Sequence, residues 1–302
     1  MKRAFVLGVL IVAGVVAAAA YQPPAQPAGP KVVTVEKLKN NLYVLRGDGG
    51  GGNVAVYVGD AGVTVVDAKN PGWGQPILDK IKELTPKPVT LLINTHTHAD
   101  HVSGNVEFPA TVDIVVQENT KTNMEKMPIF KDNGGKGMAK RTFKDRMTLG
   151  SGKDRFELYY FGRGHTNGDA WIVFPELRVV HAGDIFSGKN LPLLDYNNGG
   201  TGVEIGDSLA KAHAGIKNVD TIITGHSTQM TWGDLAEWAQ FNKDFLSDVR
   251  AAKQAGKSAD EVAAAWKIPA KYAAKGYVTN VDPAAGQRRL KDNVTNLYNE
   301  LK

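Results

Sequence analysis

Cysteine is absent from the 302 residues of this chain. Its absence excludes disulfide bonds, thiolate nucleophiles and thiolate metal ligands. Because 42% of the residues are hydrophobic, a chain of this length can bury a core that needs no disulfide bonds. Any metal ion must therefore be held by imidazole nitrogens and carboxylate oxygens, which argues against soft-metal chemistry.

A large excess of charge is also missing. The chain carries 36 lysine and arginine residues against 31 aspartate and glutamate residues, a formal net charge of +5. No basic stripe with interleaved aromatic side chains appears, so we expect no nucleic-acid partner. Residues 131–146 are basic and contain glycine, and we interpret them as a solvated loop.

Long apolar runs are missing except at the N-terminus. Residues 1–20 (MKRAFVLGVLIVAGVVAAAA) have a basic head, an uncharged apolar stretch and a final run of alanines, which is the pattern of a cleaved signal peptide. An uncleaved membrane anchor is the alternative. After cleavage, the mature protein is expected to be periplasmic or secreted, with no attachment to a membrane.

Proline dominates the segment that follows. Residues 21–30 (YQPPAQPAGP) cannot form a helix or a strand ladder, because proline lacks an amide donor and fixes φ. We interpret this segment as a linker and place the folded domain at residues 31–302.

Short runs rich in valine, tyrosine and leucine come next, separated by glycine, asparagine or aspartate. They predict β-hairpins at residues 32–38, 42–45, 54–58 and 63–66. Further strands are predicted at residues 89–93, 112–116, 156–161, 170–174, 177–180 and 221–224, with helices at residues 77–84, 117–127 and 206–216. This alternation predicts an α/β fold in which helices cover sheets.

Glycine is concentrated between two of the predicted hairpin strands, at residues 47–52 (GDGGGG). A mobile flap and a long hairpin turn are both compatible with this composition. A phosphate-binding loop is excluded, because no Gly-Lys-Ser/Thr follows.

The C-terminal part, residues 231–302, is predicted to be helical. Apolar side chains from Leu235 to Val249 recur on one helical face. Ser258 and Glu261 form a capping box for the next helix, and Pro283 can open the last one.

Histidine is scarce, with seven residues in the chain, yet most of the histidines follow predicted strands. Ligands bind beyond the carboxyl ends of strands in α/β sheets, so imidazoles and carboxylates in these loops can converge. The residues concerned are His96, His98, Asp100 and His101 in one loop, and His165, Asp184 and His226 in three others. His181 is interpreted as a structural residue or as an outer partner of a ligand, and His213 as a structural residue.

The spacing in the first loop predicts two neighbouring metal ions. Residues two apart in an extended segment face the same side, so His96 and His98 can bind one ion. Asp100 and His101 follow as the chain turns and can reach a second ion. Three imidazoles on the first ion would leave an open coordination position, as catalytic zinc requires. The expected sets are His96, His98 and His165 for the first ion and Asp100, His101 and His226 for the second, with Asp184 bridging the two.

In combination these motifs resemble those of the metallo-β-lactamase superfamily. Residues 96–101 (HTHADH) match its HxHxDH signature, and GHT at 164–166, AGD at 182–184 and GH at 225–226 match the motifs that follow. The resemblance covers about residues 33–230. It implies an αββα four-layer sandwich with a helical C-terminal tail, the ligand sets given above, and two zinc ions per chain, with iron or manganese as alternatives.

The resemblance also implies a hydrolase that acts on a small-molecule substrate. Its metal centre would supply hydroxide for attack on an activated acyl bond, as in an ester, lactone, thioester or lactam. Asp100 would move a proton as well as bind metal. Asp67 is either an outer partner that orients a ligand or a cap at a strand end. Lys189 and Asn190 could meet a substrate carboxylate, but we interpret them as surface-loop residues.

Two other activities are weighed as alternatives. Export favours a true β-lactamase, but the cysteine-bearing lactamase subclasses place a thiolate where Asp184 stands, and no lysine is convincingly placed for a substrate carboxylate. A persulfide dioxygenase-like enzyme with a single iron is disfavoured by the full ligand set from His98 to His226. The same intact set argues against a binding protein with a vestigial site.

Overall fold

Hairpins and parallel strands share the first of two β-sheets. The computed structural model describes residues 30–302, so the predicted signal peptide, and all of the predicted linker except Pro30, lie outside the described residues. The strands of this seven-stranded sheet, in spatial order, are β1 (Thr34–Lys39), β2 (Leu42–Arg46), β3 (Val54–Val58), β4 (Val63–Val66), β5 (Val89–Ile93), β6 (Asp113–Gln117) and β7 (Arg141–Phe143). Strands β1 to β4 pair antiparallel, and β4 to β7 pair parallel. The predicted hairpins are confirmed.

The second sheet has six strands and is mainly antiparallel. In spatial order its strands are β13 (Met230–Thr231), β12 (Thr221–Thr224), β11 (Val179–Gly183), β10 (Trp171–Phe174), β9 (Phe156–Tyr159) and β8 (Arg146–Leu149). Only β11 and β12 pair parallel among these neighbours. A helix connects them, because parallel neighbours need a crossover.

In the described residues, helices lie between several pairs of successive strands from β4 onward and also after the last strand. The structure has α1 (Gly74–Leu84), α2 (Ala99–Val102), α3 (Glu118–Met124), α4 (Pro128–Asp132), α5 (Ile205–Gly215), α6 (Trp232–Gln254), α7 (Ala259–Ala265), α8 (Ala270–Ala273) and α9 (Pro283–Glu300). Within the described residues, no helix is long and apolar enough to cross a membrane.

Alternation along the strands produces the layers. In β3, Val56 packs into one core and Tyr57 into another, because successive side chains point to opposite faces of a sheet. In β10, Ile172 joins the same core as Tyr57, whereas Val173 packs on the other side. The core that contains Tyr57 and Ile172 therefore lies between the two sheets.

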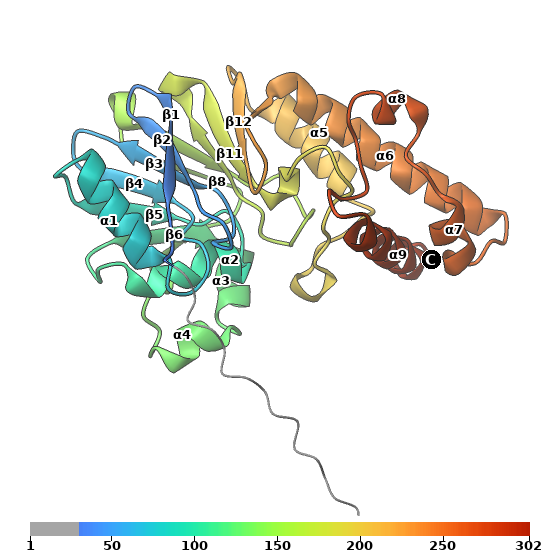
Figure 1. Ribbon diagram of the computed structural model, residues 1–302, viewed down its shortest axis with the longest axis horizontal. Helices are drawn as coiled ribbons and strands as arrows, with labels where there is room; N and C mark the ends of the chain where they lie inside the picture. Colours follow the sequence, from blue (N-terminus) through green and yellow to red (C-terminus); the bar gives the residue numbers. More distant parts are fainter. Residues whose placement is uncertain (1–29) are drawn as a thin grey trace, which may run out of the picture. The chain divides into compact units, whose positions relative to one another are not determined.

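The outer faces of both sheets are covered by helices. Ile77 of α1 is buried against the first sheet, and Leu209 of α5 and Trp238 of α6 are buried against the second. Figure 1 shows α1 beside β3 to β5, and α5 and α6 beyond β11 and β12. The four layers are those of the predicted αββα sandwich, which is confirmed.

The interpretation of residues 131–146 as a solvated loop is wrong at both ends, because α4 extends to Asp132 and strands occupy the C-terminal end. Residues Arg141–Phe143 form β7, and β8 begins at Arg146. Each of these short strands buries one residue, Phe143 or Leu149, whereas the arginines stay exposed. One buried side chain per strand is too weak a pattern to distinguish a short edge strand from a loop.

The helical C-terminal part is confirmed, and its caps form as predicted. Ser258 and Glu261 make a reciprocal capping box at α7. Pro283 is the first residue of α9, where its missing N–H leaves no hydrogen bond unmade. Residues such as Trp238 and Leu290 from α6 and α9 pack into the core on the outer face of the second sheet.

Candidate metal centre

All seven predicted ligand residues lie in loops or short helices at the ends of strands. His96 and His98 follow β5, and Asp184 comes directly after β11. Because β4 to β6 run parallel, as do β11 and β12, the carboxyl ends of these strands meet at one edge of the sandwich. The structure thereby brings residues from four separate loops together.

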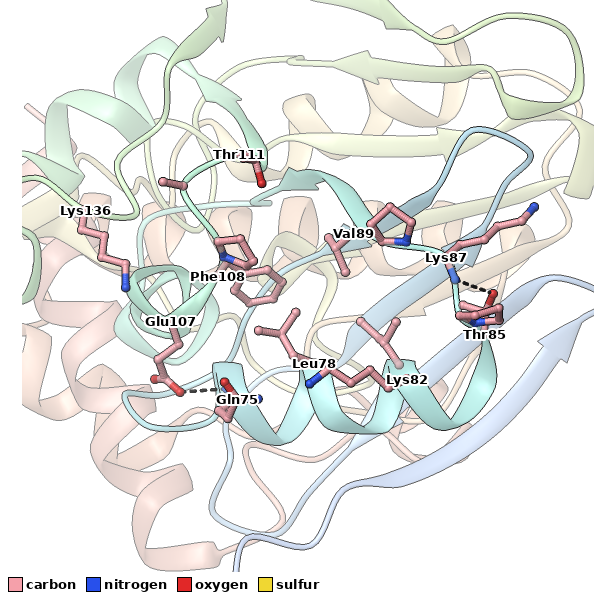
Figure 2. Close-up of a pocket in the computed structure, with 15 residues that line it drawn as sticks. Gln75, Leu78, Lys82, Thr85, Lys87, Val89, Glu107, Phe108, Thr111 and Lys136 are labelled. Carbon is pink, nitrogen blue, oxygen red and sulfur yellow. Dashed lines mark hydrogen bonds between the residues drawn. The ribbon is translucent and has the colours of Figure 1, made fainter.

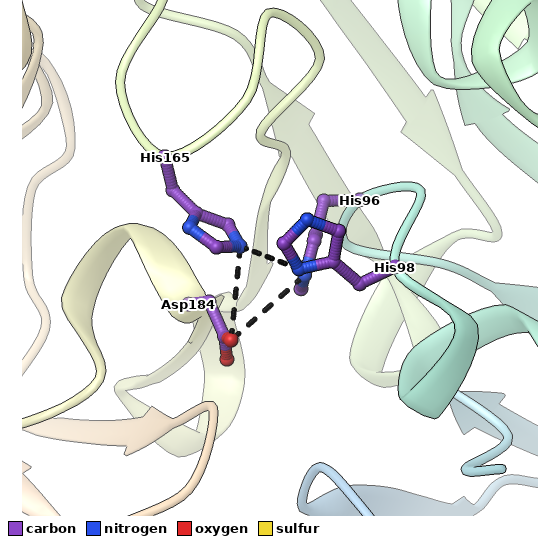
Figure 3. Close-up of side chains that lie close together, drawn as sticks. All are labelled: His96, His98, His165 and Asp184. Carbon is purple, nitrogen blue, oxygen red and sulfur yellow. Dashed lines mark hydrogen bonds and ion pairs between the residues drawn. The ribbon is translucent and has the colours of Figure 1, made fainter. Parts of the chain in front are cut away.

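The first group consists of His96, His98, His165 and Asp184, whose ligand atoms all lie within 4.8 Å of one another. His165 Nε2 lies 3.0 Å from His98 Nδ1 and 3.7 Å from Asp184 Oδ2, and His96 Nε2 lies 4.0 Å from the same oxygen. Figure 3 shows the three imidazoles turned toward one another and toward the carboxylate.

The second group consists of Asp100, His101 and His226, again with ligand atoms within 4.8 Å. His226 Nε2 lies 3.2 Å from Asp100 Oδ2 and 3.4 Å from His101 Nε2. Asp100 and His101 face this group because α2 begins at Ala99 and turns the chain away from His98.

Asp184 is close to both groups. Besides its contacts in the first group, its Oδ1 lies 3.4 Å from His101 Nε2, and its Oδ2 lies 3.3 Å from His226 Nε2. A carboxylate placed between two sets of imidazoles has the geometry that a bridging ligand requires.

The ring nitrogens that face away from the first group are held by protein acceptors. His98 Nε2 lies 2.8 Å from Asp195 Oδ2, and His165 Nδ1 lies 2.6 Å from the carbonyl oxygen of Leu193. An acceptor on one ring nitrogen keeps the proton there, which leaves the lone pair of the other nitrogen directed at the centre of the group. Asp195 was not among the residues singled out from the sequence.

Asp67, at the end of β4, serves both groups. Its Oδ2 lies 2.7 Å from His101 Nδ1 and accepts a hydrogen bond from the Thr95 hydroxyl, which in turn contacts His96 Nδ1 at 2.9 Å. Its Oδ1 accepts from the backbone N–H of Thr95. Asp67 therefore orients a histidine and also caps the end of a strand, so both interpretations of this residue describe real contacts. Its left-handed backbone, with φ of 66°, is a conformation that few non-glycine residues adopt.

Two buried polar atoms at the centre have no hydrogen-bond partner among the described residues. They are His96 Nε2 and Asp184 Oδ1. Leaving such an atom unsatisfied costs about 1–3 kcal/mol. Imidazole lone pairs and a carboxylate oxygen in this arrangement fit a zinc-type cation, which would satisfy both atoms.

Burial and neighbouring charge set the ionisation of the first group. Burial holds the pKa of His96 well below its ordinary value and, with the nearby His98, lowers the pKa of His165 to about 4. Burial also disfavours the charged form of Asp184, but His101 and His226 outweigh it and hold the pKa of this carboxyl well below its usual range. Neutral imidazoles and an ionised carboxylate are the forms that bind metal.

The second group differs in its ionisation. Burial opposes a charge on His101, but Asp184 and Asp67 outweigh that effect and raise its pKa well above the ordinary value. Contacts with Asp100 and Asp184 likewise overcome burial and raise the pKa of His226 to about 9. A metal ion that binds here must displace protons at neutral pH.

The glycine-rich loop packs beneath the second group. A Cβ on Gly51 would lie 2.4 Å from Asp100 Cβ, and one on Gly52 would lie 2.2 Å from His101 Cε1. Only glycine allows so close an approach. Lys69 is fully buried here and donates a 2.7 Å hydrogen bond to the carbonyl oxygen of Gly52. This packing favours the hairpin-turn interpretation for Gly51 and Gly52.

The remaining histidines have the structural contacts expected of them. His181 is buried, its Nε2 lies 3.1 Å from the carbonyl oxygen of Asn53, and its Nδ1 accepts from the backbone of Gly183. His213 stacks on Trp232, with ring centroids 5.2 Å apart.

A cavity of about 420 Å³ opens beside the two groups. His98, Asp100, Asp184 and His226 contribute to its wall, and Arg289 of α9 lines it as well. Asn190 also lines the cavity, although it was interpreted as a surface-loop residue. Arg289 was missed because one arginine on a predicted helix carries no sequence signal for a distant loop.

Another cavity, of about 620 Å³, lies away from this chemistry. Figure 2 shows it between α1, with Leu78, and two other segments, one with Val89 and one with Phe108. None of the seven predicted ligand residues lines it. Its wall lacks a cluster of groups able to hold a metal.

Comparison with known proteins agrees with this geometry. The sequence profile of the metallo-beta-lactamase superfamily matches residues 47–226, and the chain belongs to this superfamily. It is therefore a metal-dependent hydrolase with His/Asp metal-binding groups. The predicted family and enzyme class are confirmed.

Individual relatives are distant. A metallo-beta-lactamase type 2 from Elizabethkingia meningoseptica is 29% identical over 238 residues, which cover 74% of this chain and 88% of that protein. A hydroxyacylglutathione hydrolase from Nostoc punctiforme is 28% identical over 192 residues, covering 60% of this chain and 62% of that protein.

Solved structures share the fold at lower identity. The sec-alkylsulfatase Pisa1 from Pseudomonas sp. superposes with a TM-score of 0.71 at 16% identity, over 86% of this chain and 50% of that one. A metallo-beta-lactamase from Pontibacter korlensis gives a TM-score of 0.59 at 17% identity, over 70% of this chain and 99% of that one.

Proposed function

We propose that the protein is a dizinc hydrolase that cleaves an activated acyl bond of a small molecule, as in an ester, lactone, thioester or lactam. The observation that carries the proposal is the pair of adjoining ligand groups with Asp184 in contact with both. His96, His98 and His165 would hold one ion, and Asp100, His101 and His226 would hold the other. Two such cations supply hydroxide at neutral pH and polarise a carbonyl oxygen.

The protein's own residues complete the chemistry. The hydrogen bonds that the histidine rings donate to Asp67, Asp195 and the Leu193 carbonyl fix the rings before substrate arrives, so little reorganisation is needed during the reaction. Asp100 lines the cavity, and its side chain is 28% exposed. We infer that its carboxylate accepts a proton during attack and returns one to the leaving group.

A true β-lactamase is the second candidate, because two relatives named as metallo-beta-lactamases are 29% and 26% identical to this chain. One feature ranks it behind an esterase, lactonase or thioesterase: Asp184 stands where the cysteine-bearing lactamases place a thiolate. Lys189, the lysine considered for a substrate carboxylate, forms a 3.0 Å ion pair with Asp234 that occupies its charge. A relative named as a hydroxyacylglutathione hydrolase, at 28% identity, supports the broader acyl-transfer class.

Metal content and a substrate panel test this proposal together. Purified protein should bind two zinc ions per chain, measured by atomic emission after dialysis. It should hydrolyse at least one ester, lactone or thioester faster than any β-lactam. A chelator should abolish activity, and added zinc should restore it. Efficient turnover of several β-lactams would reverse the ranking, and one iron per chain would favour the dioxygenase alternative.

We also propose that the protein is exported. The basic head, apolar stretch and terminal alanines of residues 1–20 support this localisation. N-terminal sequencing of native protein should find a chain that begins near Tyr21 in the periplasm or the medium. Intact Met1 in a cytosolic fraction would refute export.

A further inference from the structure

One positively charged side chain in the cavity wall, that of Arg289, belongs to neither of the two metal-ligand groups. Arg289 lies on α9, which is anchored by Leu290 in the core and by a 2.9 Å hydrogen bond from Asn293 Nδ2 to the carbonyl oxygen of Pro192. Arg289 Nη1 donates to the carbonyl oxygen of Leu191 at 3.2 Å. The helix therefore presents Arg289 to the loop that carries Leu193, part of the cavity wall.

Arg289 is set apart from the other arginines by what surrounds it. Ion pairs with Asp or Glu are made by Arg46, Arg141, Arg146, Arg155, Arg163 and Arg178. Arg250 and Arg288 are exposed to solvent. Arg289 is partly buried, and within residues 30–302 no carboxylate lies within the 4.0 Å of an ion pair. A cation that is partly shielded from water and has no ion-pair partner is unfavourable, so this position suits an anion supplied from outside the chain.

The polar residues of the cavity wall are of two kinds. The acidic residues that line it are Asp100 and Asp184, and both belong to the metal-ligand groups. Asn190, Asn280 and Arg289 contribute neutral or positive groups elsewhere in the wall. Asp184 is the carboxylate whose charge acts on Arg289, and it is assigned to the metal-ligand groups. Within the cavity wall, Arg289 therefore has no carboxylate that is free of the metal-ligand groups.

The geometry of the guanidinium group limits the chemical class of anion that Arg289 can bind. Arginine presents five N–H donors in a planar fork that pairs with both oxygens of a carboxylate. One donor of Arg289 contacts the Leu191 carbonyl, and the fork keeps others for a ligand. The cavity volume of about 420 Å³ admits a small acyl compound but not a folded partner.

We infer that Arg289 binds a carboxylate group of the substrate and so selects acyl compounds that carry one. This inference rests on the proposed hydrolase function and names the substrate class of the same cavity. It also assigns to α9 of the C-terminal helical part a direct role in recognition. Lys189, the lysine nearest to Asp184 in sequence, is not available for this role because of its ion pair with Asp234.

A matched pair of esters tests the inference by activity. The probes are mono-4-nitrophenyl glutarate and the corresponding neutral 4-nitrophenyl glutaramate, assayed with zinc-loaded protein. Arg289→Gln should raise KM for the glutarate ester about 10- to 100-fold, as expected for loss of hydrogen bonds to a charged group, while kcat changes little. The neutral ester should be unaffected. Arg289→Lys should retain part of the preference, since it keeps the charge but loses the fork.

Direct binding provides a readout that is independent of turnover. Calorimetric titration with glutarate should give a dissociation constant about 10-fold weaker for Arg289→Gln than for the unmodified protein, at equal zinc content. Arg288→Gln is the matched control, because Arg288 is the neighbouring, solvent-exposed residue of the same helix and should change nothing.

The two proposals fail in different ways. If neither ester is hydrolysed but glutarate binding depends on Arg289, the choice of reaction is wrong and the carboxylate site stands. If both esters are hydrolysed equally well and Arg289→Gln changes neither KM nor glutarate binding, the hydrolase stands and the carboxylate site is refuted. Should Arg289→Gln fold poorly, equal KM values for the two esters in the unmodified protein would refute the inference just as clearly.

Discussion

The two ligand groups lie at the same edge of the sandwich but differ in their exposure. In the first group, His96, His165 and Asp184 are buried, and His98 is 20% exposed. In the second group, His101 is buried, but Asp100 and His226 are 28% and 41% exposed. A ligand set shielded from water keeps its geometry better, so we expect the first position to hold its ion more tightly than the second.

The residues that orient the ligand rings also differ between the two groups. Asp195 and the Leu193 carbonyl, both from the segment between β11 and α5, orient rings of the first group. Asp67 and the closely packed Gly52 support His101 in the second. Asp67 also reaches His96 through Thr95, so the two positions share one support and are not independent.

The largest effect is expected from Asp184→Asn, which removes the charge between the groups. Because Asp184 contacts histidines of both groups, both ions should bind more than about 100-fold more weakly, beyond the range for outer partners. Metal content after dialysis and hydrolysis of the best substrate measure the change. Asp260→Asn, at an exposed position, is the control. Two ions retained with unchanged activity would rule out bridging.

The comparison itself is tested by His165→Gln and His226→Gln. Loss of the exposed His226 should leave about one zinc ion per chain, because the buried first group is intact. Loss of His165 should weaken the tighter position, so that less than one ion survives the same dialysis. The number of zinc ions retained per chain, measured by atomic emission, distinguishes the two variants. Equal metal content in both variants would show that exposure does not distinguish the groups.

Replacement of the residues that hydrogen-bond to the ligand histidines from outside the two groups should give a smaller effect. Asp195→Asn is expected to weaken the first position about 10- to 100-fold, and Asp67→Asn to weaken the second by a similar factor. Because Asp67 also supports His96 through Thr95, its replacement should affect both positions to some degree. Competition with a chromophoric chelator measures each affinity. If Asp195→Asn weakened the second position instead, the assignment of supports would be wrong.

The smallest effect concerns Lys69 beneath the second group. Burial lowers its pKa to about 8, so the folded protein loses this proton at a lower pH than the unfolded chain does. Stability should therefore rise as pH rises through 8, because the unfolded state then binds more protons. Relative to Lys69→Met, the unmodified protein should gain about 1 kcal/mol of unfolding free energy from pH 7 to pH 9. Urea unfolding of metal-free protein at both pH values measures the difference. A constant difference would mean that Lys69 has the same pKa in the folded and the unfolded protein.

Strong local patterns were sufficient for much of the fold. The run from Val54 to Val58 predicted its strand because its β-branched residues are bounded by turn residues, and Ser258 with Glu261 predicted a helix start from a local exchange of hydrogen bonds. β7 and β8 were missed because both are short and depend on pairing with β6 and β9. A three-residue edge strand such as Arg141–Phe143 has too few buried positions to reveal itself.

The residues of the metal-ligand groups and their surroundings also divide into those that the sequence predicted and those that it did not. His96, His98, Asp100 and His101 were predicted as ligands from their spacing, and the structure brings them together with His165, Asp184 and His226. Their assignment as zinc ligands stays a prediction for the metal analysis to test. Asp195 and Arg289 were not found, since neither stands in a motif.

The sequence by itself determined the types of donor atom available, the order of most strands along the chain and the loops that carry the ligands. These properties depend on residue identity and on contacts between near neighbours in the chain. Only the tertiary structure decided that Asp195 orients His98 and that Arg289 reaches the cavity, because these residues meet the site through the packing of distant segments. The stability of such contacts depends on sheet pairing and helix packing, which no short stretch of sequence encodes.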